Sequence, residues 1–153
     1  MQREDDPWTE GVRIERVREI ESLFASNGRT VEVTDYAGRV RKFNLQASLT
    51  VGFVVTAKES AETSRGTPGY EFSAFSYTSA IEALHTLRKK MQAALATRNL
   101  APNQFPALLT DQCTGRIEAE GLVVDGEFIS WSALCGMLER HEGSEFILRI
   151  VTP

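Results

Sequence analysis

The chain has 153 residues, of which 42% are apolar and 25% charged. This size and composition exclude gross disorder and predict a single globular domain over residues 1–153, with the polar stretch 1–6 flexible. Its 17 basic and 21 acidic residues give a net charge of −4. That balance argues against a general binder of nucleic-acid phosphates, because such proteins normally carry a basic excess.

Cellular location is indicated by what the chain lacks. The N-terminus has no basic stretch followed by an apolar run, so we predict no signal peptide. The apolar runs are only a few residues long, so we predict no membrane span and no membrane partner. Cys113 and Cys135 then suggest reduced thiols, and the expected location is the cytoplasm.

The first third predicts a helix and a hairpin. Asp6-Pro7 fits an N-cap followed by proline, and apolar residues recur at helical spacing as far as Phe24, so a helix is expected over 8–26. Strands at 31–34 and 40–48 flank the turn at residues 35–38.

The middle third predicts two further strands and a second helix. The run 51–55 is apolar at both parities, which predicts a strand covered on both sides, by a second layer or by a partner copy. A polar loop at 60–69 leads to an aromatic strand at 70–77. Ser79 and Glu82 fit a capping box, and the following apolar stripe predicts a helix over 79–98. That stripe contains Ile81, Leu84, Leu87, Met91 and Leu95.

The final third predicts a compact unit after a proline-containing connector. A strand over 116–120 is followed by a tight hairpin around Asp125-Gly126, because both residues tolerate positive φ. Ser130 is expected to cap a helix over 131–141, and alternating apolar residues at 146–150 predict a last strand.

These elements predict an α+β fold with a mostly antiparallel sheet of about six to eight strands and three helices. The expected order is a helix, three or four strands, a helix, two or three strands, a helix and a last strand.

The stretch from Asp125 to Ile150 reads DGEFISWSALCGMLERHEGSEFILRI. This pattern resembles the ending of a family of short bacterial proteins of unknown function. It covers about a sixth of the chain, and it implies no activity, cofactor or site residue.

Chemical motifs are absent from the sequence. There is no P-loop, no G-x-S-x-G, no H-E-x-x-H and no closely spaced pair of cysteines, so we predict no catalytic residue, no metal site and no cofactor. Cys135 is expected in the core beside Trp131, Leu134 and Leu138. His85 and His141 are expected to be structural, with His141 partly buried near the end of its helix.

Four residues are the candidates for contacts with a partner: Trp8, Trp131, His141 and Glu142. Tryptophan is enriched among residues that dominate binding energy, although packing of Trp131 on the sheet is the favoured interpretation of that residue. The run Arg88-Lys89-Lys90 points in several directions around a helix, which is typical of a solvated surface.

Three functional hypotheses remain. The first is a non-enzymatic protein-binding module of accessory, inhibitor or immunity type, whose partner is another protein or a second copy. The second is a small-molecule-binding or enzymatic domain with a pocket between sheet and helices, using His141 with Glu139 or Glu142. The third is a weak nucleic-acid binder acting through residues 88–98.

Overall fold

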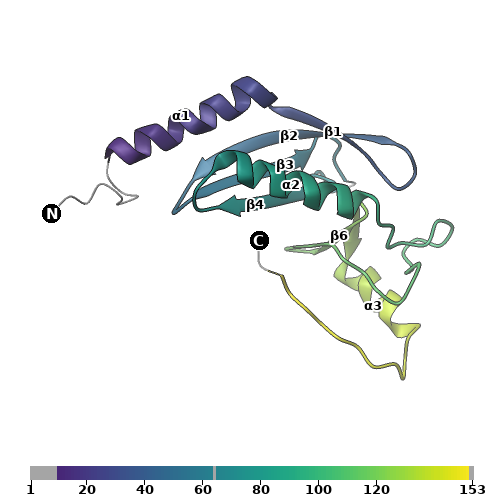
Figure 1. The fold of residues 1–153 in the computed structure, drawn as a ribbon. Coiled ribbons are helices and arrows are strands. Elements are labelled where there is room, and N and C mark those ends of the chain that lie inside the picture. The colour runs from purple at the N-terminus through teal and green to yellow at the C-terminus, as the bar shows by residue number, and fades with distance from the viewer. Residues whose placement is uncertain (1–9, 64, 152–153) are drawn as a thin grey trace.

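The computed structural model describes residues 10–63 and 65–151. In chain order its elements are α1 (Glu10–Asn27), β1 (Thr30–Thr34), β2 (Val40–Leu49), β3 (Phe53–Glu59), β4 (Glu71–Ser76), α2 (Ala80–Leu95), β5 (Arg116–Glu118), β6 (Gly121–Val124), β7 (Glu127–Ser130) and α3 (Trp131–Glu139). The strands form two antiparallel sheets with the orders β1-β2-β3-β4 and β5-β6-β7 (Figure 1). The predicted α+β class is confirmed.

The first hairpin is fixed by one buried carboxylate. Oδ1 of Asp35 accepts hydrogen bonds from the backbone N–H groups of Ala37 and Arg39, both at 2.9 Å. Gly38 supplies the positive φ of 79° that the turn needs. The turn sets the register in which Val31 lies opposite Phe43.

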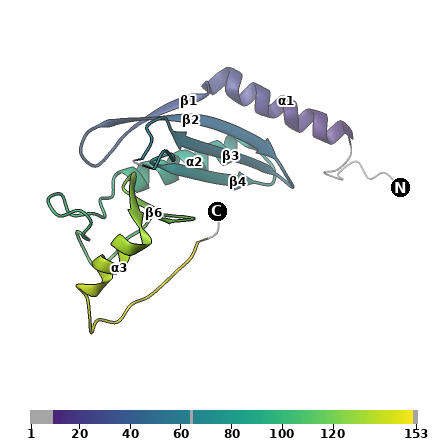
Figure 2. The ribbon, with the colours of Figure 1, turned by 180° about the vertical axis from the view of Figure 1, so that it is seen from behind.

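The main hydrophobic core lies between the four-stranded sheet and α2, which covers one face of that sheet (Figures 1 and 2). Ser79 caps α2 by accepting the N–H of Glu82 at 3.3 Å. The Glu82 carboxylate accepts instead from the hydroxyls of Ser76 and Thr78, so only half of the predicted capping box forms. Four of the five predicted stripe residues are buried, whereas Ile81 is exposed.

Helix α1 contributes only its last turns to this core, through Leu23 and Phe24. Its beginning extends past the end of the sheet (Figure 1). Val17, one of the apolar residues at helical spacing, is exposed, whereas the neighbouring Arg16 reaches the ring of Phe53 in β3 at 5.4 Å.

Strand β3 differs from its prediction. It begins at Phe53, and its burial alternates: Phe53, Val55 and Ala57 are buried while the residues between them are partly exposed. Val51 is exposed and precedes the strand. The prediction that this strand is covered on both sides within one chain is wrong. The run 51–55 is not one strand, because it spans both a turn and the start of β3.

The second unit is a three-stranded sheet with one short helix. Asp125 and Gly126 form the predicted turn with φ values of 53° and 77°. Ser130 caps α3 by accepting the N–H of Ala133 at 3.1 Å, as predicted. A smaller core of four buried residues holds this unit together, formed by Leu100, Val124, Ile129 and Met137.

Two predictions for this unit are wrong. Residues 146–150 form no strand: residues 144–151 are exposed and lack regular structure, and none of the described strands pairs with them. Cys135 is exposed and not in the core. The face of α3 that packs on the hairpin contains Ala133, Leu134 and Met137, since the tight turn from β7 directs that face inward.

Candidate functional site

The segment 144–151 carries five exposed large apolar side chains within eight residues. The turn after α3 is closed by hydrogen bonds such as Ser144 N–H to the His141 carbonyl at 2.9 Å, and Gly143 has a φ of 88°. The chain then runs extended outside both sheets (Figures 1 and 2). Five large apolar side chains follow: Phe146 (86% exposed), Ile147 (97%), Leu148 (76%), Ile150 (62%) and Val151 (72%).

The backbone of this segment is also unpaired. No hydrogen bond joins the backbone of residues 145–151 to another described residue. A sequence that alternates apolar residues, with its N–H and C=O groups free, has the properties of an unpaired strand that adds to a partner.

Helix α3 presents a second apolar stripe. Trp131, Cys135 and Leu138 lie at the spacing of one helical face, beside the face that packs on the hairpin. Trp131 is 43% exposed and Leu138 is 56% exposed. The indole N–H of Trp131 donates to the Ala119 carbonyl at 3.2 Å, which anchors the ring without covering it. We call this stripe and the segment 144–151 together the apolar surface.

The four predicted contact residues are only partly placed by the structure. Trp131 belongs to the apolar surface, and His141 and Glu142 lie in the exposed turn between its two parts. His141 is thus exposed, contrary to the expected partial burial, because α3 ends at Glu139. Trp8 lies outside the described residues. Sequence analysis did not predict that the segment 144–151 is exposed and unpaired. The charged residues that interrupt its apolar alternation are a sequence signal that could have indicated this.

A second buried carboxylate fastens the connector after α2 to the tight turn of the second unit. Asp125 accepts the backbone N–H groups of Asn99 at 2.9 Å and Leu100 at 2.8 Å, and the Asn99 side-chain amide at 2.9 Å. Arg116 adds a contact by donating to the Pro68 carbonyl at 2.8 Å. Because its oxygens are occupied by these donors, Asp125 is a structural group.

A narrow crevice of about 220 Å³ lies beside this junction. The hydroxyl of Tyr70, one of its lining residues, is buried and has no hydrogen-bond partner among the described residues. Burial and the Asp125 carboxylate raise the pKa of Tyr70, so the phenol stays protonated. The crevice is smaller than typical pockets for drug-sized ligands, and His141 does not line it.

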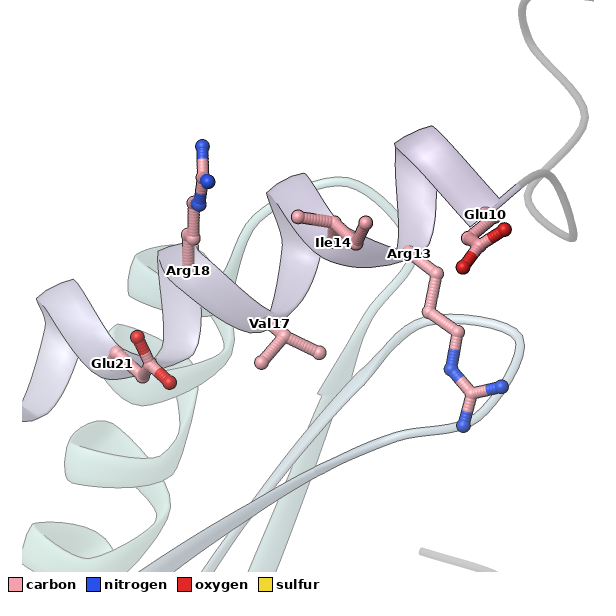
Figure 3. Close-up of a pocket in the computed structure, with 6 residues that line it drawn as sticks. All are labelled: Glu10, Arg13, Ile14, Val17, Arg18 and Glu21. Atoms are coloured by element: carbon pink, nitrogen blue, oxygen red, sulfur yellow. The ribbon is translucent and has the colours of Figure 1, made fainter.

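A larger hollow runs along α1 and is lined by that helix alone. Figure 3 shows Ile14 and Val17 beside the charged groups of Arg13 and Glu21. Among the described residues, only side chains of α1 line it.

A buried ion network stabilises the first sheet. Arg41 Nε lies 3.0 Å from Asp35 Oδ2, and its NH1 nitrogen lies 2.9 Å from Glu59 Oε1. Glu59 Oε2 in turn accepts the backbone N–H of Tyr70 at 2.9 Å. The guanidinium group also lies 5.3 Å from the centroid of the Tyr70 ring. This network joins three strand ends, so its role is structural.

The acid sensitivity of the fold follows from Asp35. Burial alone would raise its pKa, but hydrogen bonds from Arg41, Arg39 and Ala37 outweigh this and lower it below the ordinary value of 3.8. Stability from this group is therefore present above the unfolded-state pKa and is lost as pH falls through the lower folded-state pKa. We expect Asp35→Asn to reduce stability at neutral pH and to flatten its fall below about pH 4. Urea unfolding across pH, with Asp111→Asn as an exposed control, measures this.

Residues suited to metal or nucleic acid are not gathered. Within residues 10–63 and 65–151, no three His, Cys, Asp or Glu side chains lie close enough to hold a metal ion. In the basic stretch, Lys90 donates to the Ser73 carbonyl and Arg98 lies against the Tyr36 ring. In the same described ranges, no helix has both the length and the apolar character needed to cross a bilayer.

These features define an α+β protein with two small antiparallel sheets and a large apolar surface on its second unit. Residues 26–96 match a family described as Domain of unknown function (DUF7686), and residues 98–153 match one described as Domain of unknown function (DUF7713). No curated protein and no solved structure matches the chain. The two matches are separated at residue 97, which is also where the two hydrophobic cores divide.

Proposed function

We propose that the protein is a non-enzymatic protein-binding module that acts through the apolar surface of its second unit. The observation that carries this proposal is the exposure of Phe146, Ile147 and Leu148 on a backbone without hydrogen-bond partners. Contiguous exposed apolar side chains of this kind mark protein-interaction sites, because their transfer from water stabilises a complex. The module would be of accessory, inhibitor or immunity type.

The cellular setting belongs to the same proposal. The two thiols, Cys113 and Cys135, are both free, which supports a reducing compartment such as the cytoplasm. The resemblance of residues 125–150 to a bacterial family supports a bacterial host. The single-domain organisation of residues 1–153 also stays a prediction.

The double variant Phe146→Ser/Leu148→Ser tests the proposal. Chemical cross-linking of tagged protein in host extract should recover a protein, another copy included, whose yield falls about tenfold or more in the variant. The control variant Val40→Ser/Val51→Ser removes two exposed apolar side chains from the first unit. It should recover the partner protein in the same yield as the wild type. Equal recovery by both variants would contradict the proposal.

A second candidate, binding of a small polar molecule, is favoured only by the unpartnered Tyr70 hydroxyl beside the crevice. A thermal-shift screen of small metabolites tests it, since a ligand of the folded state raises the melting temperature. A shift that persists in Tyr70→Phe would rule out the hydroxyl as the recognition group.

A further inference from the structure

The segment 144–151 is complementary to itself. As an extended strand it places Phe146, Leu148 and Ile150 on one side, and Glu145, Ile147 and Arg149 on the other. Neither Glu145 nor Arg149 forms an ion pair with any residue in the described part of the chain. The two opposite charges are spaced symmetrically about Ile147.

This symmetry selects one pairing of two copies. In an antiparallel pair with Ile147 opposite Ile147, Glu145 of each strand lies opposite Arg149 of the other, and Phe146 lies opposite Leu148. Opposite charges and large apolar side chains are the favourable cross-strand pairs. Moving the centre to Leu148 would place Arg149 opposite Ile147 and remove both ion pairs. A parallel, in-register pair would place Arg149 opposite Arg149, which is unfavourable.

The apolar side of a two-stranded ribbon must also be buried, since an isolated pair of strands is only marginally stable in water. The exposed stripe of α3, formed by Trp131, Cys135 and Leu138, supplies apolar surface in the same unit. The only link between stripe and segment is the short turn of residues 140–143, so both parts are available to one interface.

We infer that two copies of this chain form a homodimer by antiparallel pairing of residues 144–150 about a two-fold axis at Ile147, with the Phe146 side of the ribbon covered by the α3 stripe. This rests on the proposed function and names its partner as a second copy. The interface is isologous, as in most dimers, because each copy contributes the same strand.

Charge reversal tests the register. Sedimentation velocity of the full chain at micromolar concentration should show a dimer. Glu145→Arg gives the segment two cations and Arg149→Glu gives it two anions, so each variant alone should weaken the dimer by about tenfold or more. An equimolar mixture of the two variants restores both attractive pairs and should form the heterodimer. The double variant Glu145→Arg/Arg149→Glu should dimerise again.

Matched controls carry the same charge changes elsewhere: Glu15→Arg on α1 and Lys89→Glu on α2, both exposed, should leave the dimer unchanged. Alkylation rates give a second readout within one chain. Cys135, on the covered stripe, should react more slowly in the dimer than in either single variant, while Cys113 should react at the same rate in all. Circular dichroism confirms that each variant is folded.

The outcomes separate the two levels of the proposal. A monomeric wild type overturns the second-copy inference, and the protein-binding proposal is then decided by the extract experiment. A dimer that is insensitive to both single reversals, or that the mixture fails to restore, overturns the pairing about Ile147. Restoration by the mixture with protection of Cys135 supports it.

Discussion

Arg41→Met is expected to destabilise the fold by about 3–5 kcal/mol, because it leaves the buried Glu59 carboxylate without a cation and Asp35 with only the exposed Arg39. The side chains of Asp35 and Glu59 are 0% and 3% exposed, and both accept from the Arg41 guanidinium group. Methionine keeps much of the side-chain volume, so the loss measures charge and hydrogen bonds more than packing. The free energy of unfolding from urea denaturation gives the value.

The control for this prediction is Arg39→Met. Arg39 also contacts Asp35, at 3.1 Å, but its side chain is 59% exposed. Removing it should cost about 1 kcal/mol or less, as for other exposed ion pairs. Similar losses in the two variants would show that the buried network contributes little.

Asp125→Ala is expected to loosen the second unit, at a cost of about 3 kcal/mol or more. Three buried donors from Asn99 and Leu100 would lose their acceptor, and each unsatisfied donor costs about 1–3 kcal/mol. Alanine also tolerates the positive φ of this turn poorly. Hydrogen exchange should accelerate in β6 and β7 while β2 and β3 stay protected.

Asp125→Asn separates the two causes of this loss. Asparagine tolerates the same backbone conformation but offers fewer acceptor sites, so it should fall between the wild type and the alanine variant. Asp111→Ala, at an exposed position, should leave exchange unchanged. Uniform acceleration across both sheets in Asp125→Ala would show instead that the two units unfold together.

The predicted local features were confirmed where a few neighbouring residues decide the structure. The Asp125-Gly126 turn and the Ser130 cap form because their backbone and side-chain preferences act within four residues. The stripe of α2 was largely confirmed because a long, regular apolar spacing has one way to face a sheet.

The wrong predictions concern contacts between distant elements. Alternation at residues 146–150 indicates a capacity to form a strand but does not identify the strand with which it pairs, and no strand in the described part of the chain pairs with this segment. The buried side of α3 was misassigned because apolar residues occupy most of that helix, and the hairpin determines which of them face inward. For the candidate site, Trp131 could be named from sequence, whereas the exposure of Phe146 and Ile147 could not.

The Asp125 carboxylate accepts hydrogen bonds from the connector at Asn99 and Leu100, while its backbone forms the tight turn between β6 and β7. A residue there must both adopt a left-handed conformation and present two oxygens to neighbouring amides, a combination that nearly restricts the choice to aspartate. The amino-acid choice at this turn is therefore limited by the connector, which lies 25 positions earlier in the chain.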